Sequence, residues 1–372
     1  MQASETILLT GATGFVGREL LWRLARVPQN EIVCLIRSRD SSEACGRVQE
    51  ILDKARPSEV TPEQRSRVRA ISGDLTVERL GLASEQWDQL VSSATRVVHG
   101  AASVEWARPL NEARQINVAG TRSLIELAQA ARARGRLRAF DYISTCYVCG
   151  KRTGLITESD LDGSQGFFNS YEQSKFEAEQ LVRSSGLPFC IFRLSTVVGD
   201  SRTGYASTFK VMYWPLKILA RGLAWVVPAD RNGIVDLVPV DYVCDTLEAI
   251  AADPCQRGKT FHVAAGPDRS STIGDILELA VKCFGQRPPI LIPPIFFEAI
   301  IWPLYLIVGK KRRELLKKGK VYRPYFSYAA VFDTAEARAK LEPLGIRPPR
   351  VEDYFQRIID YALATEWGKR EV

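Results

Sequence analysis

The stretch TILLTGATGFVG at residues 6–17 decides the fold of this 372-residue chain. A short apolar run ends in a loop with glycines at positions 11, 14 and 17, and a helical pattern starts near Phe15. Glycine lets backbone N–H groups approach a diphosphate closely, and the start of the following helix favours its negative charge. Glycines alone are weak evidence, but the strand–turn–helix context predicts a dinucleotide-binding turn.

Apolar strands alternate with amphipathic helices as far as about residue 265. This alternation predicts an α/β fold: a doubly wound parallel Rossmann sheet with a smaller, mostly helical C-terminal substrate subdomain. We place the dinucleotide-binding domain in residues 1–200, with 233–265 returning to the sheet, and the substrate-binding subdomain in 201–232 and 266–372. The expected strands are 6–10, 31–36, 68–72, 96–99, 139–144, 188–193, 233–238 and 260–263, and the main expected helices are 15–25, 111–134 and 171–184.

Composition narrows the class of protein. The net charge of +7 favours anionic partners, but no basic stripe interleaved with aromatic residues is present, so we expect no nucleic acid. Eight scattered cysteines, with one isolated CxxC pair at Cys146 and Cys149, indicate reduced thiols. Because only two histidines occur, we expect no metal site. The polar first residues do not resemble a signal peptide, and we expect a cytoplasmic protein.

The segment ILIPPIFFEAIIWPLYLIVG at 290–309 is long enough to cross a bilayer. Prolines and Glu298 interrupt it, and the basic run KKRRELLKKGK at 310–320 follows. Three interpretations stay open: a wall or lid of an acyl-binding site, contact of residues 290–320 with a membrane surface, and a true membrane span. The basic run alone is also typical of a solvated helix face.

The end of the second expected strand indicates which dinucleotide binds. Twenty residues past Gly17 the chain has Arg37, with Arg39 close by. An NAD enzyme would carry Asp or Glu there for the ribose 2′-hydroxyl, whereas a guanidinium suits a 2′-phosphate. The sequence therefore predicts NADPH as the cofactor, the alternative being a surface arginine at a strand end.

Two further strand ends carry candidate cofactor residues. Asp74 follows the third strand, where an adenine amine would lie. His99 ends the fourth strand, and the small residues Ala101 and Ala102 after it let the dinucleotide backbone come close. The alternative for His99 is a packing histidine whose ring makes no direct cofactor contact.

Tyr171 and Lys175 stand four residues apart and share one face of the expected helix. A tyrosine with a pKa near its usual value of about 10 is a poor acid or base at neutral pH. A neighbouring ammonium and a nicotinamide cation would lower that pKa, and the lysine can also hold the nicotinamide ribose. One strand earlier, Thr145 is our choice for the hydrogen bond to a substrate carbonyl, with Ser144 as the alternative.

Taken together, these motifs resemble the extended short-chain dehydrogenases/reductases. The resemblance rests on GATGFVG at 11–17, HGAA at 99–102, STCYVCG at 144–150 and YEQSK at 171–175. Finer features resemble the thioester reductase and fatty acyl-CoA reductase (male-sterility-type) branch: CLIRS at 34–38, GDL at 73–75, LGL at 80–82, WDQL at 87–90, NVAGT at 117–121, RLSTVVGD at 193–200 and DLVPVDYV at 236–243.

The resemblance covers residues 6 to about 265 well and the last quarter only loosely. The branch often has asparagine where this chain has Gly100, and usually reads STAYV where this chain has Cys146. Neither departure removes a reacting group, but both leave the placement of the substrate open.

The resemblance implies an NADPH-dependent reductase of an acyl thioester, with a triad of Thr145, Tyr171 and Lys175. The product would be an aldehyde or, after a second hydride, an alcohol. Since no part of the chain reads as a carrier domain, we expect the acyl group on coenzyme A or on a separate acyl-carrier protein. A homodimer is compatible with the resemblance. The implied cofactor contacts are Gly11, Thr13, Gly14, Phe15, Val16, Gly17, Arg37, Asp74, Leu75, His99, Ala101, Ala102, Asn117, Tyr171, Lys175, Ser195, Thr196 and Val197.

Alternative functions keep the fold and change the substrate: an NAD(P)-dependent hydroxysteroid-type dehydrogenase, or a nucleotide-sugar epimerase or dehydratase. Arg37 argues against an epimerase, because epimerases commonly retain NAD. A non-catalytic NADPH-sensing scaffold is a third alternative, but it has no need of both Tyr171 and Lys175.

Overall fold

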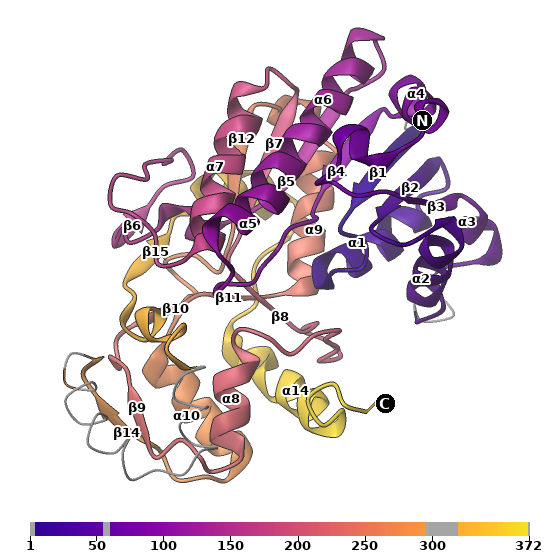
Figure 1. Cartoon of the computed structure of the whole chain (residues 1–372). Helices are drawn as coiled ribbons and strands as arrows, with labels where there is room; N and C mark the ends of the chain where they lie inside the picture. The colour runs from indigo at the N-terminus through magenta and orange to yellow at the C-terminus, as the bar shows by residue number, and fades with distance from the viewer. Residues whose placement is uncertain (1–3, 55–59, 295, 297–318, 371–372) are drawn as a thin grey trace.

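A computed structural model describes residues 4–54, 60–294, 296 and 319–370. These residues form a seven-stranded parallel sheet in the order β12-β7-β5-β4-β1-β2-β3 (Figure 1). The chain starts in the middle of the sheet and moves outward first to one side and then to the other, which confirms the doubly wound Rossmann order. The strands are β1 (Glu5–Thr10), β2 (Asn30–Ile36), β3 (Val68–Ser72), β4 (Arg96–His99), β5 (Ala139–Thr145), β7 (Phe189–Leu194) and β12 (Lys259–Val263).

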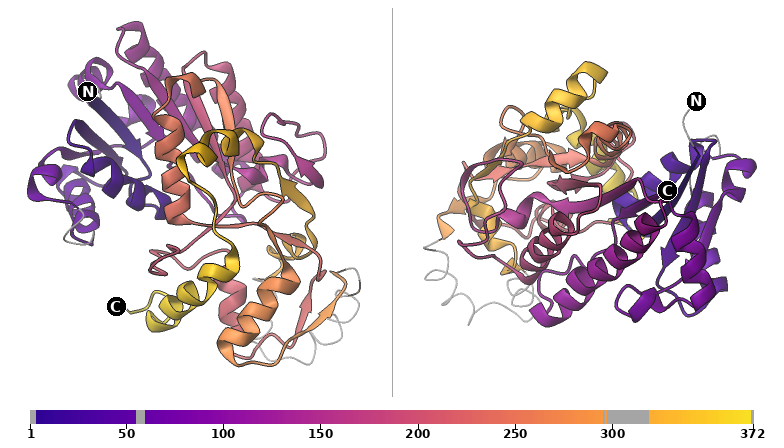
Figure 2. Two further views of the ribbon diagram at one scale, coloured as in Figure 1. Left: turned by 180° about the vertical axis from the view of Figure 1, so that it is seen from behind. Right: turned by 90° about the horizontal axis from the view of Figure 1, so that it is seen from above.

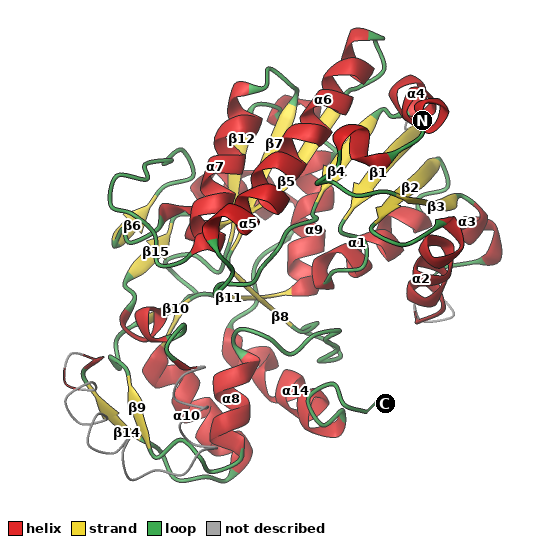
Figure 3. Cartoon of the chain, viewed as in Figure 1, coloured by secondary structure: helices red, strands yellow, loops and turns green. Residues whose placement is uncertain are grey.

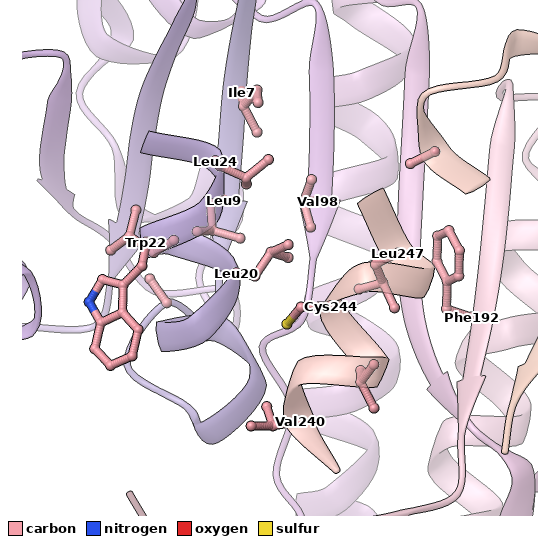
Figure 4. Packing of buried hydrophobic residues seen from close by; sticks show 14 of the residues in the cluster. Ile7, Leu9, Leu20, Trp22, Leu24, Val98, Phe192, Val240, Cys244 and Leu247 are labelled. Carbon is pink, nitrogen blue, oxygen red and sulfur yellow. The ribbon is translucent and has the colours of Figure 1, made fainter. Parts of the chain in front are cut away.

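Helices cover both faces of this sheet (Figures 2 and 3). In β1, Leu8 packs into one hydrophobic cluster while Ile7 and Leu9 pack into the other, so the strand is apolar on both faces. Figure 4 shows Leu20 of one covering helix and Leu247 of another in the layer that contains Leu9. That layer contains α1 (Phe15–Arg26), α2 (Ser41–Lys54), α9 (Val240–Ala251) and α13 (Ala335–Leu341), and the opposite one α4 (Ser84–Ser93), α6 (Gly120–Ala133) and α7 (Ser170–Ser184).

A smaller and largely helical part lies below the carboxyl ends of the strands (Figure 1). Its core is a separate hydrophobic cluster, against which Phe15 from the start of α1 also packs. Its helices are α8 (Tyr213–Ala220), α10 (Ile273–Phe284) and α14 (Val351–Ala364), and its strand pairs are β9 (Val226–Pro228) with β14 (Ile290–Ile292) and β10 (Ile234–Val235) with β13 (Ser271–Thr272).

Short elements connect the two parts. The strand pair of β8 (Thr196–Val198) with β11 (Leu237–Pro239) is parallel, as is that of β6 (Gly154–Ile156) with β15 (Ala330–Phe332). The remaining elements are α3 (Pro62–Ser66), α5 (Leu110–Arg114), a π-helical turn at Gln115–Ala119, and 3-10 turns at Glu78–Gly81, Cys146–Cys149, Pro254–Gln256, Arg323–Ser327 and Glu342–Leu344.

The expectation that residues 233–238 return to the main sheet is wrong. β10 pairs antiparallel with β13, and β11 pairs with β8, so β12 alone makes the return. Asp236, between β10 and β11, is buried and accepts hydrogen bonds from the backbone N–H groups of Ala265 (2.9 Å) and Gly266 (3.1 Å). The carboxylate therefore ties this segment to the loop after β12, while β10 and β11 pair with strands outside the main sheet.

The long apolar segment is described only at its start. Residues 290–292 form β14, whereas most of 290–309 and of the basic run 310–320 lie outside the described residues. Within the described part of the chain, no helix combines the length and the apolar character needed to cross a bilayer.

A buried ion pair joins helix α7 to the sheet. The Arg193 guanidinium of β7 donates to Glu179 Oε1 at 2.7 Å, and both side chains are at most 1% exposed. Glu179 also accepts hydrogen bonds from Ser144 Oγ of β5 at 2.7 Å and from Arg183 at the half-exposed end of the same helix. Burying a carboxylate is costly unless its oxygens are bonded, so loss of Arg193 leaves a charge that water cannot reach.

We expect Arg193→Met to lower the free energy of unfolding by about 3–5 kcal/mol, because it leaves Glu179 without its buried counter-ion. Urea denaturation at pH 7 measures the change. Arg183→Met is the matched control: it removes the other arginine on the same carboxylate and should cost less than about 1 kcal/mol, since Arg183 is partly solvated. Equal losses in the two variants would contradict this account.

Candidate active site

The glycine turn between β1 and α1 is shaped by close backbone contacts. Gly11 has a φ of +80°, and a Cβ there would stand 2.6 Å from the backbone nitrogen of Ala101. A Cβ on Gly17 would collide with the Gly11 carbonyl oxygen. Helix α1 begins after Gly14 without a side-chain cap, which leaves its first N–H groups available to an anion. The turn therefore fits a diphosphate.

A groove of about 360 Å³ runs from this turn across the carboxyl ends of the central strands. It brings together eight of the expected cofactor residues: Gly11, Thr13, Gly14, Arg37, Asp74, Leu75, Ala101 and Ala102. Its wall also contains residues that sequence reasoning missed, above all Arg47 and Ser103, and at one end Arg108 and Lys210. This space and its lining fit a dinucleotide.

Two arginines flank the groove beyond β2. Arg37 is exposed, and its carbonyl oxygen accepts a hydrogen bond from Arg47 Nη1 at 2.7 Å. Arg39 instead forms an ion pair with Glu43 at 2.8 Å and does not appear in the groove wall. The second cation beside Arg37 is thus Arg47 and not Arg39. Its position in helix α2 belongs to no motif, so no sequence pattern pointed to it.

His99 does not face the groove, contrary to the expected contact. Its ring nitrogens bond to the buried hydroxyls of Thr10 (2.8 Å) and Thr121 (2.9 Å), and the residue is 1% exposed. Burial, together with the charge of Lys175, lowers the pKa of His99 to about 3. The imidazole is therefore a neutral packing group below the groove floor, which was the alternative interpretation of the sequence.

Asn117 and Asp74 shape the loops of the groove. The side chain of Asn117, buried in the π-helical turn, accepts from the Ser103 backbone nitrogen at 2.8 Å and donates to Ser174 Oγ at 2.9 Å. It thereby ties the loop after β4 to helix α7. Asp74 accepts 2.8 Å hydrogen bonds from the backbone nitrogen and the hydroxyl of Thr76, which fixes the turn after β3.

The three expected catalytic side chains lie where β5 ends and α7 begins. Asn169 caps α7 by accepting from the Glu172 backbone nitrogen, which places Tyr171 in the first turn. The Thr145 hydroxyl lies close enough to the Tyr171 phenol to lower the pKa of that phenol, and it donates to the Leu194 carbonyl oxygen at 3.2 Å. Phenol and hydroxyl are therefore adjacent.

The electrostatics of this centre differ from the expected pattern. Burial raises the pKa of Tyr171 to about 12, and the bond to Thr145 only partly offsets this effect. Lys175 donates to the Tyr142 hydroxyl (2.7 Å) and to the Ile143 carbonyl oxygen (2.8 Å). Burial lowers the pKa of Lys175 to about 7. The expected lowering of the tyrosine pKa is thus not found in the protein alone, because desolvation dominates and the Lys175 ammonium is directed to Tyr142 and Ile143.

Ser144, the alternative to Thr145, is occupied elsewhere. Successive residues of a strand point to opposite faces, and Ser144 Oγ donates to the buried Glu179. Cys146, where the chain departs from the related sequences, is fully buried and donates its thiol proton to the Arg193 carbonyl oxygen. Neither group therefore reaches a substrate, and Thr145 is the hydroxyl beside Tyr171.

A second cavity, of about 140 Å³, lies next to this centre. Thr196 was expected on the cofactor, but its hydroxyl bonds to the Tyr147 hydroxyl at 2.9 Å, and both residues line this second cavity. Of the described residues in its wall, none carries a charged side chain. The wall combines residues of α8, β10, α10 and the segment 322–328, which were too far apart in the sequence to be grouped.

An open hollow of about 820 Å³ joins the groove to the apolar cavity. It shares Arg108 and Lys210 with the groove, and Trp106 and Tyr322 with the cavity. A ligand can thus extend from the dinucleotide site past the ends of the strands into an apolar space. Ser195 and Val197 belong to neither the groove nor the cavity wall, and Phe15, Val16 and Gly17 shape the start of α1 instead of the groove wall.

Comparisons with known proteins agree with this geometry. The model of the male sterility protein family matches residues 9–247. Nonribosomal peptide synthetase asaC of Aspergillus flavus is 32% identical over 274 residues, which are 69% of this chain but 26% of that protein. Fatty acyl-CoA reductase wat of Drosophila melanogaster is 28% identical over 281 residues, or 66% of this chain and 54% of that one. The chain thus corresponds to only a part of these relatives.

Among solved structures, the terminal R domain of the myxalamid PKS-NRPS biosynthetic pathway is similar over almost its full length. The two share 27% sequence identity with a TM-score of 0.84, and the match covers 100% of this chain and 94% of that domain. The similarity therefore includes the C-terminal quarter, where the sequence motifs were weakest.

We expect Lys175→Met to change the pH dependence of stability. Between pH 7 and 9 the folded lysine is largely neutral and the unfolded one is charged, so the unfolded state binds more protons and the lysine's destabilising effect fades as pH rises. The wild type should gain about 2 kcal/mol relative to the variant over that interval, measured by urea unfolding. The exposed lysine Lys259, replaced in the same way, should show no such gain. Parallel curves for Lys175→Met and wild type would show that the buried amine keeps an ordinary pKa.

Proposed function

Because the chain belongs to the male sterility protein family, within the extended short-chain dehydrogenases/reductases, we propose that it is an NADPH-dependent reductase of acyl thioesters. The observation that carries the proposal is the hollow that connects a dinucleotide groove to an uncharged cavity. The Tyr171–Thr145 pair lies beside that cavity, because Thr145 accepts a hydrogen bond from the backbone nitrogen of Tyr147, a residue of the cavity wall. A redox cofactor and an apolar acyl group would meet at this pair.

Residues already described would hold the cofactor. The glycine turn suits the diphosphate, and Arg37 and Arg47 suit a 2′-phosphate. When bound, a nicotinamide dinucleotide supplies the hydride that the reduction needs. Lys175 lies on α7 one helical turn after Tyr171, and its ammonium, which donates to Tyr142 and Ile143, would hold a ribose hydroxyl.

The chain's own groups handle the proton. With its pKa raised to about 12, Tyr171 is protonated at neutral pH and can give its proton to the thioester oxygen as negative charge develops there. Thr145 stays beside that oxygen as a second polar contact, and donors fixed in advance stabilise developing charge strongly. The resulting hemithioacetal collapses to an aldehyde and a free thiol. A second round of reduction would give the alcohol.

The wall of the cavity favours an apolar acyl group. A nucleotide-sugar substrate needs polar or charged groups around its hydroxyls and phosphates, and the described residues of the cavity wall offer none that is charged. Coenzyme A and carrier proteins are anionic, which suits the net charge of +7. We therefore propose acyl-CoA or an acyl-carrier protein as donor.

We expect Tyr171→Phe to lower kcat/KM for octanoyl-CoA by about 10²–10⁴-fold, the usual contribution of a positioned proton donor. NADPH absorbance and trapping of the released thiol measure the same turnover independently. Tyr242→Phe, which alters a buried tyrosine of α9 away from the centre, serves as the control. Assays with an acyl-carrier protein, a hydroxysteroid and a sugar nucleotide complete the panel. No thiol release from any thioester, with reduction of NADP+ by the hydroxysteroid or epimerisation of the sugar nucleotide, would reject the thioester substrate.

We expect Arg37→Ala and Arg47→Ala each to weaken NADPH binding by about 10–100-fold while NADH binding changes little, since each removes a charge-assisted hydrogen bond to a 2′-phosphate. Fluorescence titration of both nucleotides measures the two dissociation constants. Arg39→Ala is the matched control, because Arg39 pairs with Glu43 outside the groove wall. If NADPH affinity were the same in all three variants, the residue that binds the 2′-phosphate would lie elsewhere.

A further inference from the structure

Three tyrosines at a spacing of three residues line the apolar cavity from one short segment. Tyr322, Tyr325 and Tyr328 lie in or beside the 3-10 turn Arg323–Ser327, where residues three apart share a face. The chain then continues into β15, which pairs with β6. This C-terminal segment thus lies at the carboxyl ends of the strands, and contacts with another element must hold it there.

Helix α7 provides that attachment next to the catalytic tyrosine. Glu172 directly follows Tyr171, is fully buried, and accepts a hydrogen bond from the Tyr325 hydroxyl. Its other carboxylate oxygen accepts from the Phe168 backbone nitrogen at 2.9 Å. Asn169, the cap of α7, donates to the Tyr325 oxygen at 2.6 Å. One phenol is thus held by two side chains of the turn that positions Tyr171.

The ring of Tyr325 forms part of the cavity wall beside Trp106, where the hollow meets the cavity. Its centroid is 4.7 Å from that of Trp106, a residue common to the walls of both spaces, and 5.6 Å from that of Tyr147. Such contacts fix the plane of an aromatic ring as well as its position. A change in the orientation of Tyr325 would therefore alter the cavity wall beside Trp106.

We propose that Glu172 is a positioning residue which, together with Asn169, holds Tyr325 as the wall between the reaction centre and the apolar cavity, and so sets the preference for long apolar acyl groups over short ones. The inference rests on the proposed thioester reduction. Glu172 acts through Tyr325 and does not touch the reacting atoms. A short acyl group ends before the cavity, so its reduction depends on Tyr171 and Thr145 but little on this wall.

The burial of Glu172 makes its hydrogen bonds to the Phe168 nitrogen and the Tyr325 hydroxyl important for the position of Tyr325. Burial raises the pKa of this carboxyl to about 7, which shows how few polar groups surround it. A buried carboxyl oxygen that loses its donor becomes an unsatisfied polar group, and the site relaxes to find another partner. Removing the Tyr325 hydroxyl should therefore shift the ring and not merely delete one atom.

The experiment compares octanoyl-CoA with acetyl-CoA as substrates and uses the ratio of their kcat/KM values. In Tyr325→Phe the ratio should fall about tenfold, mainly through a higher KM for octanoyl-CoA, because the lost bond is to a charged group. Tyr354→Phe is the matched control: it removes a buried hydroxyl of α14 that bonds to the Leu237 carbonyl oxygen at 3.3 Å, away from Tyr171. This control should keep the wild-type ratio.

Variants at Glu172 test whether the two residues act together. Glu172→Leu should reproduce the effect of Tyr325→Phe, and the double variant should be no worse than either single one, since both remove the same contact. Glu172→Gln should fall between wild type and Glu172→Leu, because its amide oxygen can serve Tyr325 or Phe168 but not both. Additive losses, or an unchanged ratio in Tyr325→Phe, would overturn the proposal.

A binding measurement separates this inference from the proposed reaction. Fluorescence titration with dansyl-undecanoic acid reports occupancy of the apolar cavity without turnover. Tyr325→Phe and Glu172→Leu should each raise its dissociation constant at least fivefold, while Tyr354→Phe should not. If the wild type reduced no thioester but these binding differences were found, thioester reduction would be rejected. The role of Glu172 in positioning Tyr325 in the cavity wall would still be supported. Equal dissociation constants in all the variants would reject the wall.

Discussion

The carboxylate of Glu179 is the contact on which the geometry of the reaction centre depends. It binds Arg193 of β7, Ser144 of β5 and Arg183 of its own helix, so that α7 is fixed against two neighbouring strands at once. Ser144 precedes Thr145, and Glu179 lies one helical turn after Lys175. A helix held in this way cannot slide or rotate relative to β5 without breaking a buried charge pair. Tyr171 and Thr145 are consequently brought together by contacts made elsewhere on the same helix and strand.

The same helix connects the two halves of the molecule. Its inner face belongs to the sheet, while its first turn holds Asn169 and Glu172, which attach the C-terminal aromatic segment. Tyr171, the attachment of the aromatic segment at Glu172, and the ion pair of Glu179 thus all lie on a single helix. This arrangement lets a groove shaped for a charged dinucleotide and a cavity shaped for an apolar group share one short boundary.

The predictions that were confirmed rest on patterns within short stretches of sequence. The apolar runs of the central strands and the glycine turn are short-range patterns, and both the parallel sheet and the position of the turn agree with them. The failures depend on contacts between distant residues. The pattern of residues 233–238 predicted a strand of the main sheet, but Asp236 binds a loop some thirty residues later. Arg47 reaches the groove from a helix face that carries no motif, and Tyr325 meets Glu172 across 153 positions.

The pKa values show a further limit of pattern reading. The YxxxK spacing correctly puts Tyr171 and Lys175 on one helix, but how deeply they are buried is a property of the whole fold. Desolvation raises the one pKa and lowers the other, the reverse of what two isolated neighbours would do. Spacing therefore identifies the groups, whereas the surrounding structure decides their charge.

The π-helical turn at Gln115–Ala119 gives up regular helical hydrogen bonding, and in return it orients a side chain that shapes the groove. The wide turn accommodates one residue more than a regular helix would, and this extra residue aims Asn117 at both Ser103 and Ser174. Deleting one residue here would restore regular hydrogen bonding but rotate the side chains on one flank by about 100° relative to the other. The regular helix would then lose its contact with the loop after β4. Such a deletion would therefore give a more stable helix at the expense of the shape of the groove.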